Sequence, residues 1–359
     1  MEDSNNEFIC PECGTVVTQS HAVCPKCGAN LDWGDAVLFA GIAPMQLGDI
    51  IDKSFRMTGT VFLRALVIVL ILLVPAAVLL GEGSLEFYGT LGKMAQNEAF
   101  STSTAFLPAL LEAMGIFALA LTLSLLLGLA GELAVTLLVR SELARSRMSW
   151  TEALGGAFKL RYLRALGVML LQAAAIAGIV VVPFGLLILS RNGIIIALLG
   201  LLMLPLLIGL VIFLVIRWSM AFTTVACEDS GVIAAMNRSW FLIAGNWWRV
   251  FGILLLFGVL ANFAVGIITT PVSLIALWDF YREYFKMLGT IGHGQPDPAS
   301  IGRMLSSMGF GVGVSAALNM MLLTLVKPVY TTVLYFDLRA RNGEFAARPP
   351  ERSPSNPTP

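Results

Sequence analysis

Four cysteines near the N-terminus are the residues whose type and spacing point most directly to chemistry. Cys10 is followed at the third position by Cys13, and Cys24 by Cys27, with a proline after the first cysteine and a glycine after the second of each pair. Four thiolates at this spacing complete a closed tetrahedral shell around one Zn²⁺ ion and leave no position open for a substrate. We therefore predict a structural zinc ribbon over residues 7–30, in which metal binding supplies the folding energy.

The role of this ribbon has several interpretations. It could dock a cytosolic protein partner, or it could be a stable cap that contacts nothing. Nucleic-acid binding is disfavoured, because Lys26 is the only basic residue of the ribbon. His21 could compete as a zinc ligand, although the four cysteines already complete the shell.

Two ionisable residues, Glu132 and Lys327, lie inside long apolar stretches, each about two turns from the predicted cytosolic end of its helix. Charges within a membrane span are costly unless they are paired or hydrated, and they mark candidate functional sites. We predict that the two side chains face the bundle interior and form an ion pair. The alternatives are that Lys327 extends to the inner headgroups or that the charges belong to a transport path. Asn262 and Asn319 are further polar candidates at mid-span, where interhelical hydrogen bonds are the simpler explanation.

These residues must be positioned by a membrane-embedded body. The chain of 359 residues is 57% hydrophobic and only 13% charged, whereas soluble domains carry roughly 25% charged residues. The expected fold class is an all-α integral membrane protein with six transmembrane helices. The predicted spans are residues 61–80, 107–139, 165–189, 194–216, 250–277 and 309–336.

The domain organisation follows from this pattern. A linker at 31–46 is expected to join the ribbon to a transmembrane domain at 47–341, and a proline-rich, disordered tail to follow at 342–359. The acidic N-terminus lacks the apolar core of a cleavable signal peptide. Cys227, apart from the paired cysteines, is expected to be a small buried hydrophobe.

Lysine and arginine placement predicts the orientation. With both termini in the cytosol, most of the 23 basic residues fall on the cytosolic side. Those residues are Lys26, Lys53, Arg56, Arg64, Arg140, Arg145, Arg147, Lys159, Arg161, Arg164, Arg217, Arg238, Arg249, Arg339, Arg341, Arg348 and Arg352. The outer side holds Lys93, Arg191, Arg282, Lys286 and Arg303. A bacterial cytoplasmic membrane is the expected location, because the ribbon thiolates require a reducing compartment.

An internal repeat is visible in the body. Residues 53–64 and 238–249 each carry a basic residue, a serine, an aromatic residue and a second basic residue at identical offsets. Residues 157–164 are a shorter version of the same pattern. We expect each to be an amphipathic helix on the cytosolic face that leads into a span, with arginines reaching lipid phosphates. Residues 278–286 are expected to form an interfacial helix on the outer leaflet, with a ligand-binding lid as the alternative.

Parts of the body resemble a known family. Residues 47–56, the triplet Arg238-Ser239-Trp240 and the ending at 334–344 look like the bacterial membrane domain that also occurs attached to some glycerophosphodiester phosphodiesterases. The resemblance covers about residues 45–345, and the Tyr-x-Asp-Leu-Arg-x-Arg stretch at 335–341 is its most specific part. It implies a six-span topology more than an activity. The ribbon resembles the short double Cys-Pro-x-Cys-Gly ribbons at the ends of many bacterial membrane proteins.

The phosphodiesterase chemistry itself is not expected here. It would require a barrel-sized catalytic domain, paired histidines and a carboxylate metal site, and the only histidines are His21 in the ribbon and His293 in an outer loop. We therefore expect a non-enzymatic scaffold, adaptor or regulator in the lipid bilayer, with the ribbon as the docking module for a protein partner and no nucleic-acid partner.

Two other functions remain open. One is a transporter of a small solute or lipid through a polar bundle interior, and the other is an accessory subunit of a lipid or glycerophosphodiester enzyme. Gly309, Gly313 and Ala317 are spaced four apart and allow close helix approach. Packing within the bundle explains this spacing better than a homo-oligomer face, which is the alternative.

Overall fold

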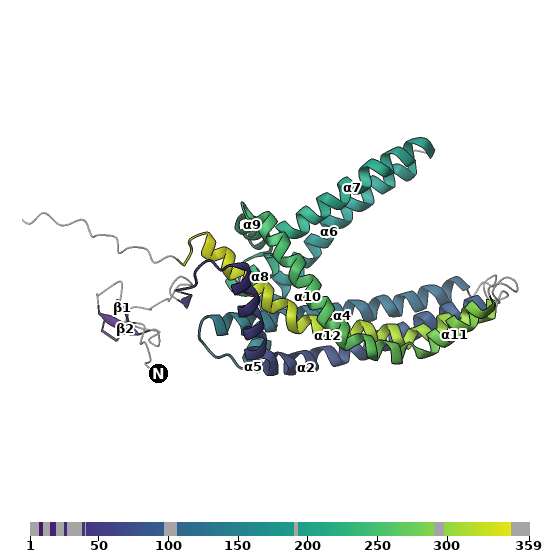
Figure 1. Ribbon diagram of the computed structural model, residues 1–359, viewed down its shortest axis with the longest axis horizontal. Coiled ribbons are helices and arrows are strands. Elements are labelled where there is room, and N and C mark those ends of the chain that lie inside the picture. The colour runs from purple at the N-terminus through teal and green to yellow at the C-terminus, as the bar shows by residue number, and fades with distance from the viewer. Residues whose placement is uncertain are drawn as a thin grey trace, which may run out of the picture. The chain divides into compact units, whose positions relative to one another are not determined.

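The computed structural model describes residues 7–9, 15–18, 25–26, 38–39, 41–96, 106–189, 193–290 and 298–345 (Figure 1). The chain divides into two compact units. One consists of Met1–Gln46 with Phe336–Pro359, and the other is Leu47–Tyr335.

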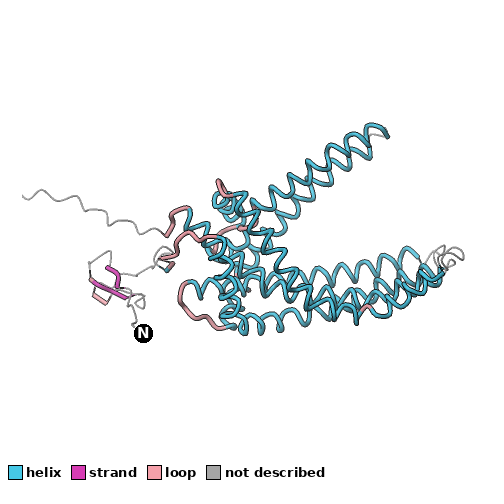
Figure 2. The backbone as a smooth tube through the Cα atoms, viewed as in Figure 1, coloured by secondary structure: helices cyan, strands magenta, loops and turns pink. Residues whose placement is uncertain are grey.

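Six helices are long and apolar enough to cross a membrane, as predicted from the sequence. They are α2 (Leu47–Gln96), α4 (Phe106–Leu143), α6 (Leu160–Leu189), α7 (Gly193–Arg217), α10 (Trp247–Ala276) and α12 (Pro298–Arg341). A helix satisfies its backbone polar groups internally, which is why apolar runs of this length become helices in lipid. Figure 2 shows that helices make up nearly all of the regular structure in the described part of the chain.

The helices are longer than the predicted spans. Helix α2 has 50 residues, which corresponds to about 75 Å of helix, whereas the hydrocarbon core is about 30 Å thick. The part of α2 beyond residue 80 packs on α12 through small residues, since a Cβ placed on Gly313 would lie 2.8 Å from the Cα of Gly81. Gly309 likewise faces the backbone of Ser84 and Leu85. The predicted stripe of small residues therefore packs within the bundle.

Helices α2 and α4 are antiparallel neighbours. The Ser124 hydroxyl of α4 donates to the carbonyl of Ala76 on α2 over 3.0 Å, while Gly131, further along α4, faces Leu72, which lies earlier on α2. Along this contact the core is aliphatic, with Ile68 and Leu133 fully buried. Helices α5, α6 and α8 pack on α4, and α5 also contacts α2.

Four short helices connect the spans. They are α5 (Trp150–Ala157), α8 (Ala221–Glu228), α9 (Val232–Ile243) and α11 (Trp278–Thr290). Helix α5 begins with a capping box formed by Ser149 and Glu152, and α11 confirms the predicted helix at 278–286. Helix α8, which the sequence did not indicate, is almost entirely buried. Cys227 in α8 is buried as predicted.

The predicted repeat takes three different forms. In the repeat segment 238–249, a break at Gly245, with φ of +78°, separates α9 from α10. Near the shorter segment 157–164, α5 ends at Ala157 and α6 begins at Leu160. The segment 53–64 has no break, because α2 runs continuously from Leu47. A shared sequence pattern thus adapts to different local packing.

The other unit contains the N-terminal strands and the end of α12. Strands β1 (Glu7–Ile9) and β2 (Val16–Thr18) pair antiparallel. The Phe39 ring lies 4.4 Å from that of Phe336, and both rings contact Phe345, which is buried. The predicted linker at 31–46 therefore includes packed residues, and the packing continues beyond the predicted start of the tail at 342. Residues 346–359 lie outside the described residues.

Candidate functional site

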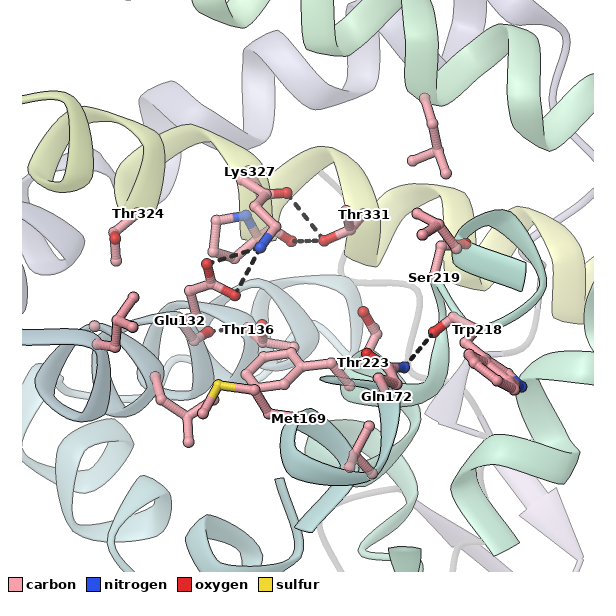
Figure 3. Close-up of a pocket in the computed structure, with 18 of the residues that line it drawn as sticks. Glu132, Thr136, Met169, Gln172, Trp218, Ser219, Thr223, Thr324, Lys327 and Thr331 are labelled. Carbon is pink, nitrogen blue, oxygen red and sulfur yellow. Dashed lines mark hydrogen bonds and ion pairs between the residues drawn. The ribbon is translucent and has the colours of Figure 1, made fainter. Parts of the chain in front are cut away.

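The central feature of the site is an ion pair between two membrane-spanning helices. The Lys327 Nζ atom on α12 lies 2.9 Å from Oε1 and 3.1 Å from Oε2 of Glu132 on α4. Figure 3 shows the ammonium facing both carboxylate oxygens. The predicted pair is therefore confirmed, and the lysine contacts the carboxylate in place of reaching toward headgroups.

Glu132 lies beside the apolar stretch of α2. Gly131, the residue before it, faces Leu72 of α2, with 3.9 Å between a Cβ placed on the glycine and Leu72 Cδ1. Leu72 stands close to the middle of the apolar stretch 61–80. A charge beside such a stretch is costly when it is unpaired.

A cavity of about 500 Å³ lies beside the ion pair. Such a volume is typical of small-molecule sites. Its polar lining residues are Glu132, Thr136, Gln172, Ser219, Thr223, Thr324, Lys327 and Thr331. Its apolar walls include Leu125, Leu129, Val168, Met169, Ile176, Val215, Phe222, Leu254 and Met320. The lining comes from α4, α6, α7, α8, α10 and α12, so the cavity is assembled by most of the bundle.

The polar groups of the cavity are held in place by bonds to backbone carbonyls. The Thr136 hydroxyl donates to the carbonyl of Glu132 over 2.8 Å, and the Thr331 hydroxyl donates to that of Lys327 over 2.9 Å. The Gln172 side-chain amide donates to the carbonyl of Trp218 over 3.1 Å (Figure 3). A hydroxyl that donates in this way keeps its oxygen lone pairs as acceptors. The cavity therefore offers fixed acceptors in addition to the two charges.

Two predicted site residues lie elsewhere. The amides of Asn262 and Asn319 donate to the carbonyls of Gly258 and Ser315, one turn earlier in their own helices, and neither residue lines the cavity. The predicted four-residue polar site is thus reduced to Glu132 and Lys327. A mid-span asparagine can satisfy its donor within its own helix, so its presence alone does not indicate a shared site.

Several residues that line the cavity were not predicted from the sequence. Gln172 could have been found, because it is the one amide side chain in the apolar stretch 165–189. Threonines such as Thr136 and Thr331 carry no comparable signal, since they commonly bond their own helix. Thr223 lies in helix α8, which was not predicted, and Ser219 lies just before it, so only the packed structure brings these two residues to the cavity.

The predicted zinc ligands Cys10, Cys13, Cys24 and Cys27 lie outside the described residues. Strands β1 and β2 directly flank the segment that carries the first pair, and Pro25 and Lys26, between the second pair, form a turn. Among the residues that the structure describes, no group of three or more histidine, cysteine or acidic residues could hold a metal ion.

The arginines at the predicted cytosolic ends of the helices bind carboxylates of the same chain. Arg64 on α2 pairs with Glu142 at the end of α4. Arg164 at the start of α6 pairs with Asp229 over 2.8 Å. Glu228, beside that aspartate, binds Arg238 over 3.0 Å. These ion pairs tie helix ends together, and contact of the arginines with lipid phosphates stays a prediction.

Comparison with known proteins adds a family but no activity. A domain of unknown function, DUF7847, matches residues 45–338. The chain belongs to this family. The matched region contains the six spans, the ion pair and the cavity, and it begins after the cysteine-rich segment. No curated protein and no solved structure matches the chain.

Proposed function

We propose that the helix bundle is a membrane-embedded binding site for a small polar or amphipathic ligand, as in a transporter or ligand-responsive membrane protein. The observation that carries this proposal is the cavity of about 500 Å³ beside the Glu132–Lys327 ion pair at membrane depth. It supports the transporter alternative over a purely structural bundle. The proposed activity is non-enzymatic.

A structural role alone would leave part of this arrangement unexplained. An ion pair that only joined two helices would be enclosed by side chains, because packing excludes the space beside it. The Lys327 side chain is instead 49% exposed and that of Glu132 24% exposed, and both line the cavity. The charges are therefore accessible to a molecule that enters the space between α4, α6 and α12.

The proposed location is a bacterial cytoplasmic membrane, with both termini in the cytosol. The excess of lysine and arginine at one set of helix ends supports this orientation. The resemblance to the membrane domain of some glycerophosphodiester phosphodiesterases agrees with a role in the envelope, and an accessory subunit of such an enzyme is a variant of the same proposal.

Ligand binding can be tested with two neighbouring residues of α10. Leu254 lines the cavity, whereas Leu255 is 55% exposed on the same helix. The full chain is purified in mild detergent, incubated with a bacterial total lipid and metabolite extract, and examined by native mass spectrometry. Leu254→Trp is expected to lose the bound small molecule and Leu255→Trp to retain it. The proposal is wrong if neither the parent nor the Leu255→Trp chain carries a small molecule.

We propose a second function for the N-terminal segment, namely a zinc ribbon that docks a cytosolic protein. The pairing of β1 with β2 around the first cysteine pair supports it. Purified chain is expected to contain one zinc ion, and the Cys10→Ser, Cys13→Ser double variant to lose it while the bundle still inserts. The docking proposal predicts that this variant also loses specific proteins that copurify with the parent chain. An unchanged set of copurified proteins contradicts it.

A further inference from the structure

The charges of the cavity restrict what the ligand can be. We infer that it is a net-neutral zwitterion with a primary ammonium and an anionic phosphate or carboxylate group, which binds between Glu132 and Lys327 and takes over their mutual contacts. This inference rests on the proposed ligand-binding function. It adds the chemical class of the ligand and the role of each charge.

Charge neutrality is the first argument. In a low-dielectric site, removing one partner of an ion pair leaves an uncompensated charge, which is strongly unfavourable. A ligand carrying only a negative charge would compete with Glu132 for Lys327 and leave the carboxylate without its cation. A ligand carrying only a positive charge would do the reverse. A zwitterion supplies a counter-charge to both residues at once, so each charge exchanges one partner for another.

Hydrogen-bonding capacity is the second argument. The Lys327 ammonium presently makes two bonds, at 2.9 and 3.1 Å, to the two oxygens of Glu132. A ligand ammonium with N–H donors can reproduce these bonds to the carboxylate, whereas a quaternary ammonium has no N–H to donate. The freed lysine then donates to the anionic group of the ligand. Thr331, a lining residue whose hydroxyl donates to the Lys327 carbonyl, keeps an acceptor oxygen for the ammonium.

The walls indicate that the ligand also has an apolar part. Besides the charged pair, the lining includes the apolar residues Leu129, Met169, Ile176, Leu254 and Met320. An apolar wall of this kind favours an aliphatic group by removing it from water or by matching lipid chains. Two sources share this chemistry: a membrane lipid with a phosphoethanolamine headgroup and a soluble amino-acid-like zwitterion.

The experiment compares probes of different charge on the purified full chain. Native mass spectrometry measures binding of phosphatidylethanolamine, phosphatidylglycerol and phosphatidylcholine with identical acyl chains, and of soluble phosphoethanolamine and leucine. At least one probe with a primary ammonium and an anionic group is expected to bind at least tenfold more tightly than the glycerol and choline lipids. The probe that binds identifies the source as membrane lipid or solute.

Variants assign the effect to the ion pair. The Glu132→Gln, Lys327→Met double variant removes both charges together, so it avoids a lone buried charge and is expected to fold. It should lose the tenfold preference. The matched control, Glu112→Gln with Lys93→Met, removes one acidic and one basic residue at exposed positions and should keep the preference.

The outcomes separate this inference from the proposed function. The zwitterion inference is overturned if no probe with a primary ammonium binds more tightly than phosphatidylglycerol and phosphatidylcholine, or if the neutral double variant keeps the preference. If the Leu254→Trp substitution still abolishes binding in that case, the cavity remains a ligand site for another chemical class. If Leu254→Trp has no effect on any probe, the proposed site itself is wrong.

Discussion

Lys327 on α12 donates two hydrogen bonds, of 2.9 and 3.1 Å, to the carboxylate of Glu132 on α4, across 195 positions of sequence. This contact joins two of the longest helices of the bundle, α4 with 38 residues and α12 with 44. It also forms the polar end of a cavity whose other walls are largely aliphatic. The same pair therefore joins α4 to α12 and supplies the only opposite charges that line the described cavity.

Breaking this pair on one side should destabilise the bundle. Glu132→Gln leaves the Lys327 ammonium without its counter-charge, and we expect a loss of about 2–3 kcal/mol. The Glu132→Gln, Lys327→Met double variant should recover most of that loss, because neither charge remains. Thermal unfolding in detergent measures both, with Glu112→Gln on the exposed face of α4 as the control. A double variant less stable than either single variant would contradict this explanation.

The contact between α2 and α12 should depend on glycine. A Cβ on Gly313 would lie 2.8 Å from the Cα of Gly81, so Gly313→Val forces the two backbones apart. We expect a loss of about 1–3 kcal/mol. Gly266→Val on α10 is the matched control, since nothing lies within 4 Å of its Cβ position. Melting temperatures of the two variants, compared with the parent chain, test the prediction, and equal values for both would refute it.

Glu228 should be the most sensitive carboxylate at the ends of the helices. It accepts hydrogen bonds from Arg238 at 3.0 and 3.1 Å and from the buried Tyr335 hydroxyl. Glu228→Gln weakens these bonds together, and we expect a loss of about 2–3 kcal/mol.

The control for Glu228 is a solvent-exposed pair. The Arg56 and Asp52 side chains, which form a salt bridge on α2, are 75% and 63% exposed. Asp52→Asn should change the stability by less than about 0.5 kcal/mol. Chemical denaturation in detergent compares the two variants. Similar losses for both would show that burial of the carboxylate does not set its contribution.

Glu283 on α11 should make stability depend on pH. The Lys286 ammonium, 2.7 Å away, and the nearby Arg303 and Arg282 guanidinium groups hold the pKa of Glu283 below its usual range. A lowered pKa in the folded state stabilises the protein above the unfolded-state pKa of about 4.3. This stabilisation is lost as the pH falls through the folded-state pKa.

The measurement is the difference in melting temperature between the parent chain and Glu283→Gln from pH 6 to pH 3. The difference should be constant near pH 6 and should shrink as the pH falls below about 4.3. A difference that stays constant over the whole range would show that Glu283 contributes no pH-dependent stability.

Local sequence patterns were enough to predict the six spans but not their lengths, their junctions or the short helix α8. Apolar runs near 61–80 and 309–336 indicated spans, because uninterrupted hydrophobicity of this length is specific for a membrane helix. The extension of α2 to Gln96 depends on contacts with α12, which no local pattern reveals. Helix α8 was missed for a similar reason. Its short sequence of apolar and hydroxyl residues could equally form a loop, and its burial, which favours the helix, is visible only in the tertiary structure.

For the site, too, the sequence predicted properties of single segments but not the contacts between segments. By itself, the sequence determined that the chain has six apolar spans and two charges within them, because each of these properties belongs to a single segment. It also placed a cysteine pattern for zinc at the N-terminus. Only the tertiary structure decided that Glu132 meets Lys327 while Asn262 and Asn319 turn to their own helices. Partner choice among distant residues, and the space left between them, follow from how helices pack, and packing is a property of the whole bundle.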